Sequence, residues 1–241
     1  MHKINRFLLG FERMVMMAFA RTFLEFNVRF EQPLPGGAKI FAPNHPTTTD
    51  PFLMSLVTQE PLIILVNKRI FKLPLVGKLI EKAGTIPVDK DGGEGEVIIT
   101  QTANLLSTGI PVAIFPEGRL SPDVTSLARL HTGVTRIALK ADCPVIPVGI
   151  YLHKHSIKSH YFHKQYRLDE SRWILHGKYY ITVGEPLYFK GDVNDHILVQ
   201  QFTQQLSEEM QRLMLISEAR ANQKSIAWNP IIPLFARSMN R

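Results

Sequence analysis

The sequence predicts an α/β fold: a mixed, largely parallel sheet covered by helices on both faces, preceded by an N-terminal amphipathic helical segment. Short apolar runs alternate along the chain with segments of helical periodicity, which is typical of strands joined by crossover helices. The 241 residues are 45% hydrophobic and 20% charged, enough to bury the core of one α/β domain. We therefore expect a helical segment over 1–32 and an α/β domain over 33–241.

The first thirty residues carry apolar side chains at helical spacing, interrupted by arginines at 6, 13, 21 and 29. Two interpretations stay open: a helix packed on the domain, or an amphipathic helix for membrane attachment, with Arg at the headgroups. Charges at Glu12 and Arg13 break the apolar run early, which disfavours a membrane span or a signal peptide. The apolar positions are Phe7, Leu8, Phe11, Met14, Val15, Ala18 and Phe19.

The remaining elements follow the turn at 33–37. Asp50 and Pro51 together indicate a helix start, with Asp50 at the N-cap and Pro51 in the first turn. Glycines at 84 and 109 mark the ends of two further helices. The pattern predicts strands over 39–42, 62–66, 85–88, 110–115, 145–151 and 174–183, and helices over 50–57, 75–82, 94–107, 134–141 and 192–220.

Composition indicates which classes of partner and chemistry this protein can have. The net charge of +7 favours anionic partners, either phospholipid surfaces and phosphate-bearing ligands or nucleic acid. Cys143 is the single cysteine, so an internal disulfide is excluded, no cysteine-based zinc pattern can form, and a reducing, cytoplasmic location is expected. The chain also lacks a Gly-x-Ser-x-Gly nucleophile elbow, so it offers no obvious residue for a covalent acyl intermediate.

The polar loops that follow the predicted strands carry the candidate chemistry, because sites of α/β sheets gather at strand ends. In the first loop, Pro46 keeps His45 out of the helical conformation and Asp50 begins the next helix, so the two side chains can meet across the loop. Asp50 would then accept from one imidazole nitrogen and leave the other as a base. The alternative is that Asp50 only caps its helix and His45 only bonds to backbone.

A second loop, 115–121, holds Glu117, Gly118 and Arg119 after a strand. Gly118 permits a tight turn, and the planar guanidinium of Arg119 suits a phosphate group. The alternative is a local ion pair between Glu117 and Arg119. From these residues alone the two interpretations are even.

Four blocks in order now resemble a known family. They are Asn-His-Pro-Thr-Thr-Thr-Asp at 44–50, Gly-Thr-Ile-Pro-Val-Asp-Lys at 84–90, Phe-Pro-Glu-Gly at 115–118 and Val-Ile-Pro-Val at 145–148. These are similar to the NHx4D, GxxxxDR-type, FPEG and VxPV blocks of the glycerophospholipid acyltransferase superfamily. Within it the chain resembles the 1-acylglycerol-3-phosphate O-acyltransferase branch, from about residue 37 to 190.

The resemblance implies a mechanism and its participants. His45 would take the proton of a lysophospholipid hydroxyl as that oxygen attacks an acyl thioester, and Asp50 would orient His45. Glu117, Gly118 and Arg119 would shape the acceptor site, with help from Lys68, Asp89 and Lys90. The family further implies an acyl-CoA or acyl-carrier-protein donor, no metal and no cofactor. Because nucleic-acid motifs are missing, we expect no nucleic-acid partner. The N-terminal segment and the basic charge predict a peripheral or monotopic position on the cytoplasmic face of a membrane.

Two departures from the family pattern bear on the acceptor. The family reads FPEGTRS, whereas here Arg119 stands one place early and Leu120 fills its usual position. The family also has a lysine before the block that resembles Phe-Lys-Leu-Pro at 71–74. Without a gap, that lysine aligns with Asn67, and Lys68 comes one place late. The expected acceptor is 1-acylglycerol-3-phosphate; the alternatives are another lysophospholipid or polar alcohol, or a thioesterase or lipid-binding scaffold on the same fold.

A histidine-rich, basic segment follows the strand at 145–151. We expect it to be a solvated loop near anionic lipid, because acidic or cysteine ligands for zinc are not close in sequence and nucleic-acid motifs are missing. Its members are His153, Lys154, His155, Lys158, His160, His163 and Lys164.

Overall fold

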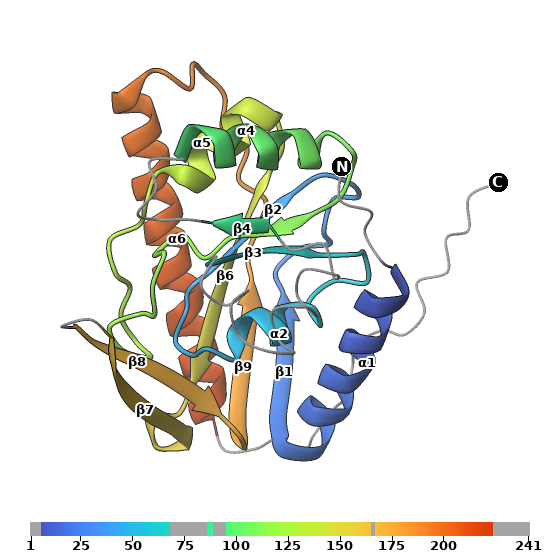
Figure 1. Cartoon of the computed structure of the whole chain (residues 1–241), viewed down its shortest axis with the longest axis vertical. Coiled ribbons are helices and arrows are strands. Elements are labelled where there is room, and N and C mark those ends of the chain that lie inside the picture. Colours follow the sequence, from blue (N-terminus) through green and yellow to red (C-terminus); the bar gives the residue numbers. More distant parts are fainter. Residues whose placement is uncertain (1–5, 68–85, 89–94, 165–166, 224–241) are drawn as a thin grey trace.

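The computed structural model describes residues 6–67, 86–88, 95–164 and 167–223 (Figure 1). A seven-stranded sheet forms the centre of this part of the chain, and a separate two-stranded hairpin lies beside it. The elements are α1 Arg6–Phe23, β1 Leu24–Phe30, β2 Ile40–Pro43, α2 Asp50–Met54, β3 Ile63–Asn67, β4 Ile86–Val88, α4 Gly95–Leu106, β5 Val112–Ala113, α5 Gly133–Ala141, β6 Val145–Leu152, the 3-10 turn Lys154–Ser156, β7 Ile157–Lys164, β8 Arg167–Ile174, β9 Gly177–Val183 and α6 His196–Asn222.

The strand order in the large sheet is β1-β9-β6-β2-β5-β3-β4. Among these described strands, neighbours run parallel except β6 and β9, which are antiparallel. The predicted mixed, largely parallel sheet is therefore confirmed. Parallel strands bring their carboxyl ends to one edge, which is where the loops after β2 and β5 lie.

Side chains alternate between the two faces of the sheet, and helices cover each face. On β2, Phe41 belongs to the same buried cluster as Leu53 and Met54 of α2, on the face that α1 also covers. Its neighbour Ile40 points the other way and packs with Val134 of α5 in the cluster that α4 and α6 share. The helices on both faces predicted by the sequence are thus confirmed.

Helix α6 lies directly on the sheet at Gly149 of β6. A Cβ atom built on Gly149 would stand 2.2 Å from the backbone carbon of Leu213, so only glycine permits this approach. The helix begins at Asp195, whose carboxylate accepts hydrogen bonds from the amides of Ile197 and Leu198. This contact holds β6 beside Ile150, the residue to which Asn44 of the loop after β2 is hydrogen-bonded.

The prediction of helix over all of the first thirty residues is wrong for 24–30. Helix α1 ends at Phe23, and Leu24–Phe30 forms the edge strand β1, parallel to β9. The apolar residues Leu24, Phe26 and Val28 alternate with polar ones, which is the period of a strand. The division of the chain at residue 32 stays a prediction.

The expected solvated loop around 153–164 is also corrected. A short 3-10 turn there leads into β7, which pairs antiparallel with β8 as a hairpin outside the large sheet. Both strands carry polar residues on each face, so the alternation that marks a strand was missing from the sequence. The helix predicted over 75–82 lies outside the described residues.

Candidate active site

His45 and Asp50 meet in the loop between β2 and α2. His45 Nδ1 lies 3.0 Å from Asp50 Oδ2. Because a carboxylate only accepts hydrogen bonds, Nδ1 carries the proton and Nε2 is left with a free lone pair. The imidazole packs against the ring of Phe115, with centroids 4.2 Å apart, and its side chain is 17% exposed. The predicted pairing of these two residues is present in the structure.

Asp50 is not the N-cap of α2, as the sequence suggested, but its first helical residue. Its side chain turns back into the loop and is fully buried. Oδ2 also accepts from the backbone amide of Thr47 at 2.7 Å, and Oδ1 accepts from the Thr47 hydroxyl at 2.5 Å. These bonds compensate a charge that has left water, and they fix the carboxylate opposite His45.

Tyr179 is a further partner of Asp50 that sequence reasoning missed. Its hydroxyl donates to Asp50 Oδ1 at 2.7 Å from strand β9, and its ring stacks on Phe26 of β1. Burial, followed by the nearby Asp50 charge, raises the pKa of Tyr179 well above its usual value. Tyr179 is therefore a neutral, permanent donor. A separation of 129 residues along the chain leaves no local signal for this contact.

Asn44 fixes the start of the same loop. Its side-chain amide donates to the carbonyl of Ile150 at 2.9 Å and accepts from the amide of Ile150 at 2.6 Å. The buried Asn44 thereby continues the pairing of β2 with β6 one step beyond the last strand residue. This bond anchors His45, the next residue, to the sheet.

Glu117 connects the 115–121 loop to the loop that carries His45, from inside the protein. It is 1% exposed, and Oε1 accepts from the backbone amide of His45 at 3.0 Å and from the Ser121 hydroxyl at 2.6 Å. Oε2 accepts from the amide of Ala128 at 2.7 Å. Glu117 thus supports the backbone of His45, and its expected share in acceptor binding stays a prediction.

The other predicted acceptor residues fall into two groups. Gly118 has φ of +62°, in the left-handed region, and makes the tight turn that was expected. Arg119 beside it is exposed and makes no hydrogen bond or ion pair with the residues described. The predicted positions Lys68, Asp89 and Lys90 lie outside the described residues.

Strand β8 touches both loops through Arg172, another residue that the sequence did not point to. The carbonyl of Arg172 accepts from the amide of Thr48 at 2.7 Å, and Arg172 Nη1 donates to the carbonyl of Ser121 at 2.7 Å. Its hydrogen bond to the Glu170 carboxylate raises the pKa of Arg172. The hairpin therefore holds together the two loops that form the site.

Metal-ligating and nucleophilic side chains are the remaining groups that could take part in chemistry. In the described ranges, His, Cys, Asp and Glu do not gather in a group of three or more that could hold a metal ion. Burial, followed by the charge of Asp142, raises the pKa of the Cys143 thiol to about 12, which leaves it protonated at neutral pH. His45 Nε2, with its free lone pair, is suited to act as a general base.

A buried carboxylate that orients a histidine, at the carboxyl edge of a largely parallel sheet, defines a class of general-base enzymes. The family model described as Acyltransferase matches residues 25–151, a span that contains both loops of the site. The chain belongs to the acyltransferase family. The resemblance drawn from the four sequence blocks is thereby confirmed.

Individual relatives agree with this assignment. The chain is similar to the lyso-ornithine lipid O-acyltransferase of Pseudomonas aeruginosa, with 34% identity over 53% of this chain and 48% of the relative. It is similar to a 1-acyl-sn-glycerol-3-phosphate acyltransferase of Chlamydomonas reinhardtii, with 26% identity over 49% of this chain and 35% of the relative. The matches thus span half or less of the curated relatives.

A solved structure shares the fold. The crystal structure of the 1-acyl-sn-glycerophosphate (LPA) acyltransferase PlsC from Thermotoga maritima superposes with a TM-score of 0.61, over 91% of this chain and 81% of that chain. Sequence identity is 19%, so the likeness establishes the α/β architecture alone.

Proposed function

We propose that this protein is an O-acyltransferase that moves a fatty acyl group from an acyl thioester to the hydroxyl of a lysophospholipid. The observation that carries the proposal is the His45–Asp50 pair, with Nδ1 bound to the carboxylate and Nε2 free to act as a base. Family membership and the activities for which both curated relatives are named support this reaction.

The reaction follows from the geometry of the pair. His45 Nε2 takes the proton of the acceptor hydroxyl while that oxygen forms a bond to the thioester carbonyl carbon. The C–S bond then breaks, and the imidazolium returns the proton to the leaving thiolate. Asp50 stabilises the positive imidazolium between these steps. General-base assistance of this kind accelerates a reaction by roughly 10²–10⁴-fold.

The donor and acceptor are assigned by chemical class. The donor is acyl-CoA or acyl-carrier protein, a co-substrate, and the chemistry of His45 and Asp50 needs no cofactor. The exposed Arg119 offers a guanidinium fork to an anionic headgroup, with Lys68, Asp89 and Lys90 expected to contribute. A 1-acylglycerol-3-phosphate acceptor fits this charge, and the Pseudomonas relative makes a lyso-ornithine lipid the second candidate.

The test is acyl transfer by the purified full chain. It would use labelled acyl-CoA and acyl-carrier-protein donors with a panel of lysolipids that includes both candidate acceptors. Transfer to a lysolipid should be lost in His45→Ala, while the variant still unfolds cooperatively. Hydrolysis of the thioester without transfer would indicate a thioesterase instead. Vesicle binding without turnover, equal in His45→Ala and wild type, would indicate a lipid-binding scaffold.

Membrane attachment is the second part of the proposal. Phe11, Met14 and Val15 of α1 are 50%, 60% and 42% exposed and share the outward side of the helix. No helix among the described residues combines the length and apolar character needed to cross a bilayer. Helix α1 would therefore lie in the interface of the membrane, on the cytoplasmic face where acyl thioesters are available.

A further inference from the structure

We infer that the β7–β8 hairpin and the adjoining end of the sheet form a docking surface for an anionic lipid bilayer. This surface, the hairpin rim, consists of Phe23, Lys158, His160, Trp173, Leu175 and His176. The inference rests on the proposed function, since a lipid acceptor requires the bilayer to lie close to His45. The hairpin rim would contact the bilayer at a second place, in addition to helix α1.

The register of the hairpin shows which side chains share its outer face. Lys158 lies opposite Trp173, and His160 lies opposite Ser171, so these four residues point to one side. Lys158, His160 and Trp173 are exposed. The other face turns to the domain, where Ile174 is buried. The hairpin therefore presents an outer face that the described domain leaves uncovered.

The part of that outer face nearest the large sheet carries the basic side chains of Lys158 and His160. Lys158 and His160 form no ion pair with any described acid. On β8, Glu170 belongs to the inner face and is bound by Arg172, whereas Asp169 shares the outer face by register, opposite Phe162 and nearer the tip of the hairpin. A lysine near an anionic lipid surface strengthens binding to that surface, and tryptophan prefers the boundary between headgroups and acyl chains.

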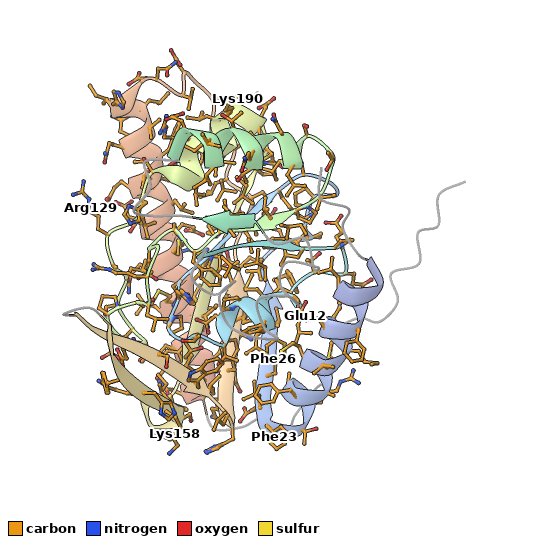
Figure 2. All side chains as sticks on the ribbon, in the orientation of Figure 1. Glu12, Phe23, Phe26, Arg129, Lys158 and Lys190 are labelled. Atoms are coloured by element: carbon orange, nitrogen blue, oxygen red, sulfur yellow. The ribbon has the colours of Figure 1, made fainter. Side chains whose placement is uncertain are left out.

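Apolar side chains extend this face toward helix α1. Leu24 and Gly177 are register partners in β1 and β9, which places Phe23 close to the 175–176 turn at one end of the sheet. Phe23 and Leu175 are 55% and 53% exposed, and Trp173 is 37% exposed. Figure 2 shows Phe23 and Lys158 along the same lower edge of the molecule, with Lys190 at the opposite end. The hairpin rim is thus continuous with the end of α1.

Strand β8, which carries part of the hairpin rim, is also hydrogen-bonded to the loop that carries His45. The hydroxyl of Thr48 accepts from the amide of Arg172 at 3.2 Å, and that of Thr49 accepts from the amide of Ile174 at 3.3 Å. Contact between the rim and a bilayer would therefore place the His45 loop beside an acceptor held in the membrane. An acidic carrier protein would satisfy the charges, but exposed Phe, Trp and Leu beside α1 favour acyl chains as the partner.

The first test is sedimentation of the full chain with vesicles of phosphatidylcholine and phosphatidylglycerol in equal parts. Lys158→Glu and Leu175→Glu should each weaken binding, the former by about tenfold at low salt. Lys190→Glu and Ile197→Glu are matched controls on exposed positions away from the rim and should bind like wild type. Equal binding by all four variants, or equal weakening by all four, would overturn the inference.

A second test reports contact directly. The chain has two tryptophans, so Trp228→Phe leaves Trp173 as the single fluorophore. Its emission should shift to shorter wavelength on adding the vesicles and be quenched by brominated lipid. An unchanged spectrum, or a shift produced by acidic carrier protein but not by vesicles, would refute lipid docking. Neither test needs acyl transfer, so its failure is distinct from failure of the enzymatic proposal.

Discussion

Tyr179 of strand β9 donates its hydroxyl to Asp50, the residue that orients His45, over 2.7 Å. Tyr179→Phe removes this bond and keeps the ring that stacks on Phe26. A hydrogen bond to a charged group contributes about 1.5–3 kcal/mol, so we expect kcat to fall by roughly tenfold to a hundredfold while KM for the acceptor changes little. Steady-state kinetics with a lysolipid acceptor would measure both constants.

The matched control is Tyr180→Phe in the same strand. The Tyr180 hydroxyl bonds to Glu25 and does not touch Asp50. This variant should retain the wild-type kcat. If both tyrosine variants lose activity equally, the effect comes from strand β9 as a whole rather than from the bond to Asp50.

Asp50→Asn tests the loop as a structural unit. An amide in place of the carboxylate would direct NH2 hydrogens at donors of Thr47 or Tyr179, which leaves buried groups unpaired. The free energy of unfolding in urea should fall by about 2–3 kcal/mol, and turnover should fall strongly. A stability loss below about 0.5 kcal/mol would show that this network is not needed for folding.

Glu117→Gln and Arg119→Ala should separate support of the loop from acceptor binding. Glu117 accepts three internal hydrogen bonds, so its substitution should lower kcat and cost about 2 kcal/mol of unfolding free energy. Arg119 is exposed, so its substitution should leave the melting temperature unchanged and raise KM for an anionic acceptor by about tenfold. An unchanged KM in Arg119→Ala would remove Arg119 from the acceptor site.

Glu12 of α1 gives a prediction about pH. Burial raises the pKa of Glu12 from 4.5 to about 7. The native state therefore binds this proton more tightly than the unfolded chain does, so stability is lost as the pH rises from 4.5 to 7. Glu12→Gln should raise the melting temperature at about pH 8 and have little effect at about pH 4.5. Glu12 lies on the side of α1 that faces the sheet (Figure 2).

The control for this experiment is Glu185→Gln, at an exposed position after β9. It should leave the melting temperature unchanged at both pH values. A gain in Glu12→Gln that is equal at both pH values would assign the effect to packing instead of ionisation.

Membrane attachment through α1 can be tested without truncating the chain. Met14→Glu places a charge in the exposed apolar side of α1 and should reduce sedimentation with vesicles by about tenfold or more. Val97→Glu on α4, where Val97 is 53% exposed, is the control and should bind as wild type does. Wild-type binding by Met14→Glu would place the anchor elsewhere. A deletion of 1–30 would confuse this test, because it also removes strand β1.

The sequence was sufficient to predict the contact between His45 and Asp50 because its signals are local. Proline after His45 and a helix that begins at Asp50 bring the two side chains together across five residues. The same local signal misled the N-cap prediction, because the Asp50 carboxylate turns away from the helix amides to meet Tyr179. The contact of Asp50 with Tyr179 of β9 depends on how distant strands assemble, so no residue near Asp50 in the sequence predicts it.

The errors in the fold have a similar cause. Strand β1 follows α1 without a turn, so apolar residues at helical spacing are followed directly by apolar residues at every second position. Because no turn residue marks the change at Leu24, the sequence pattern predicted one continuous helix. Hairpin β7–β8 is not covered on both faces, so its sequence lacks the apolar run of a core strand. By contrast, β2 and β6 are buried throughout, and their apolar runs predicted them correctly.

Helix α1 ends at Phe23 and strand β1 begins at Leu24, with no residue between them. Such a junction joins the helix to the sheet directly, without an intervening loop. A helix held in the bilayer surface would set the tilt of the whole domain. A lipid acceptor would then reach His45 by lateral diffusion within its own leaflet.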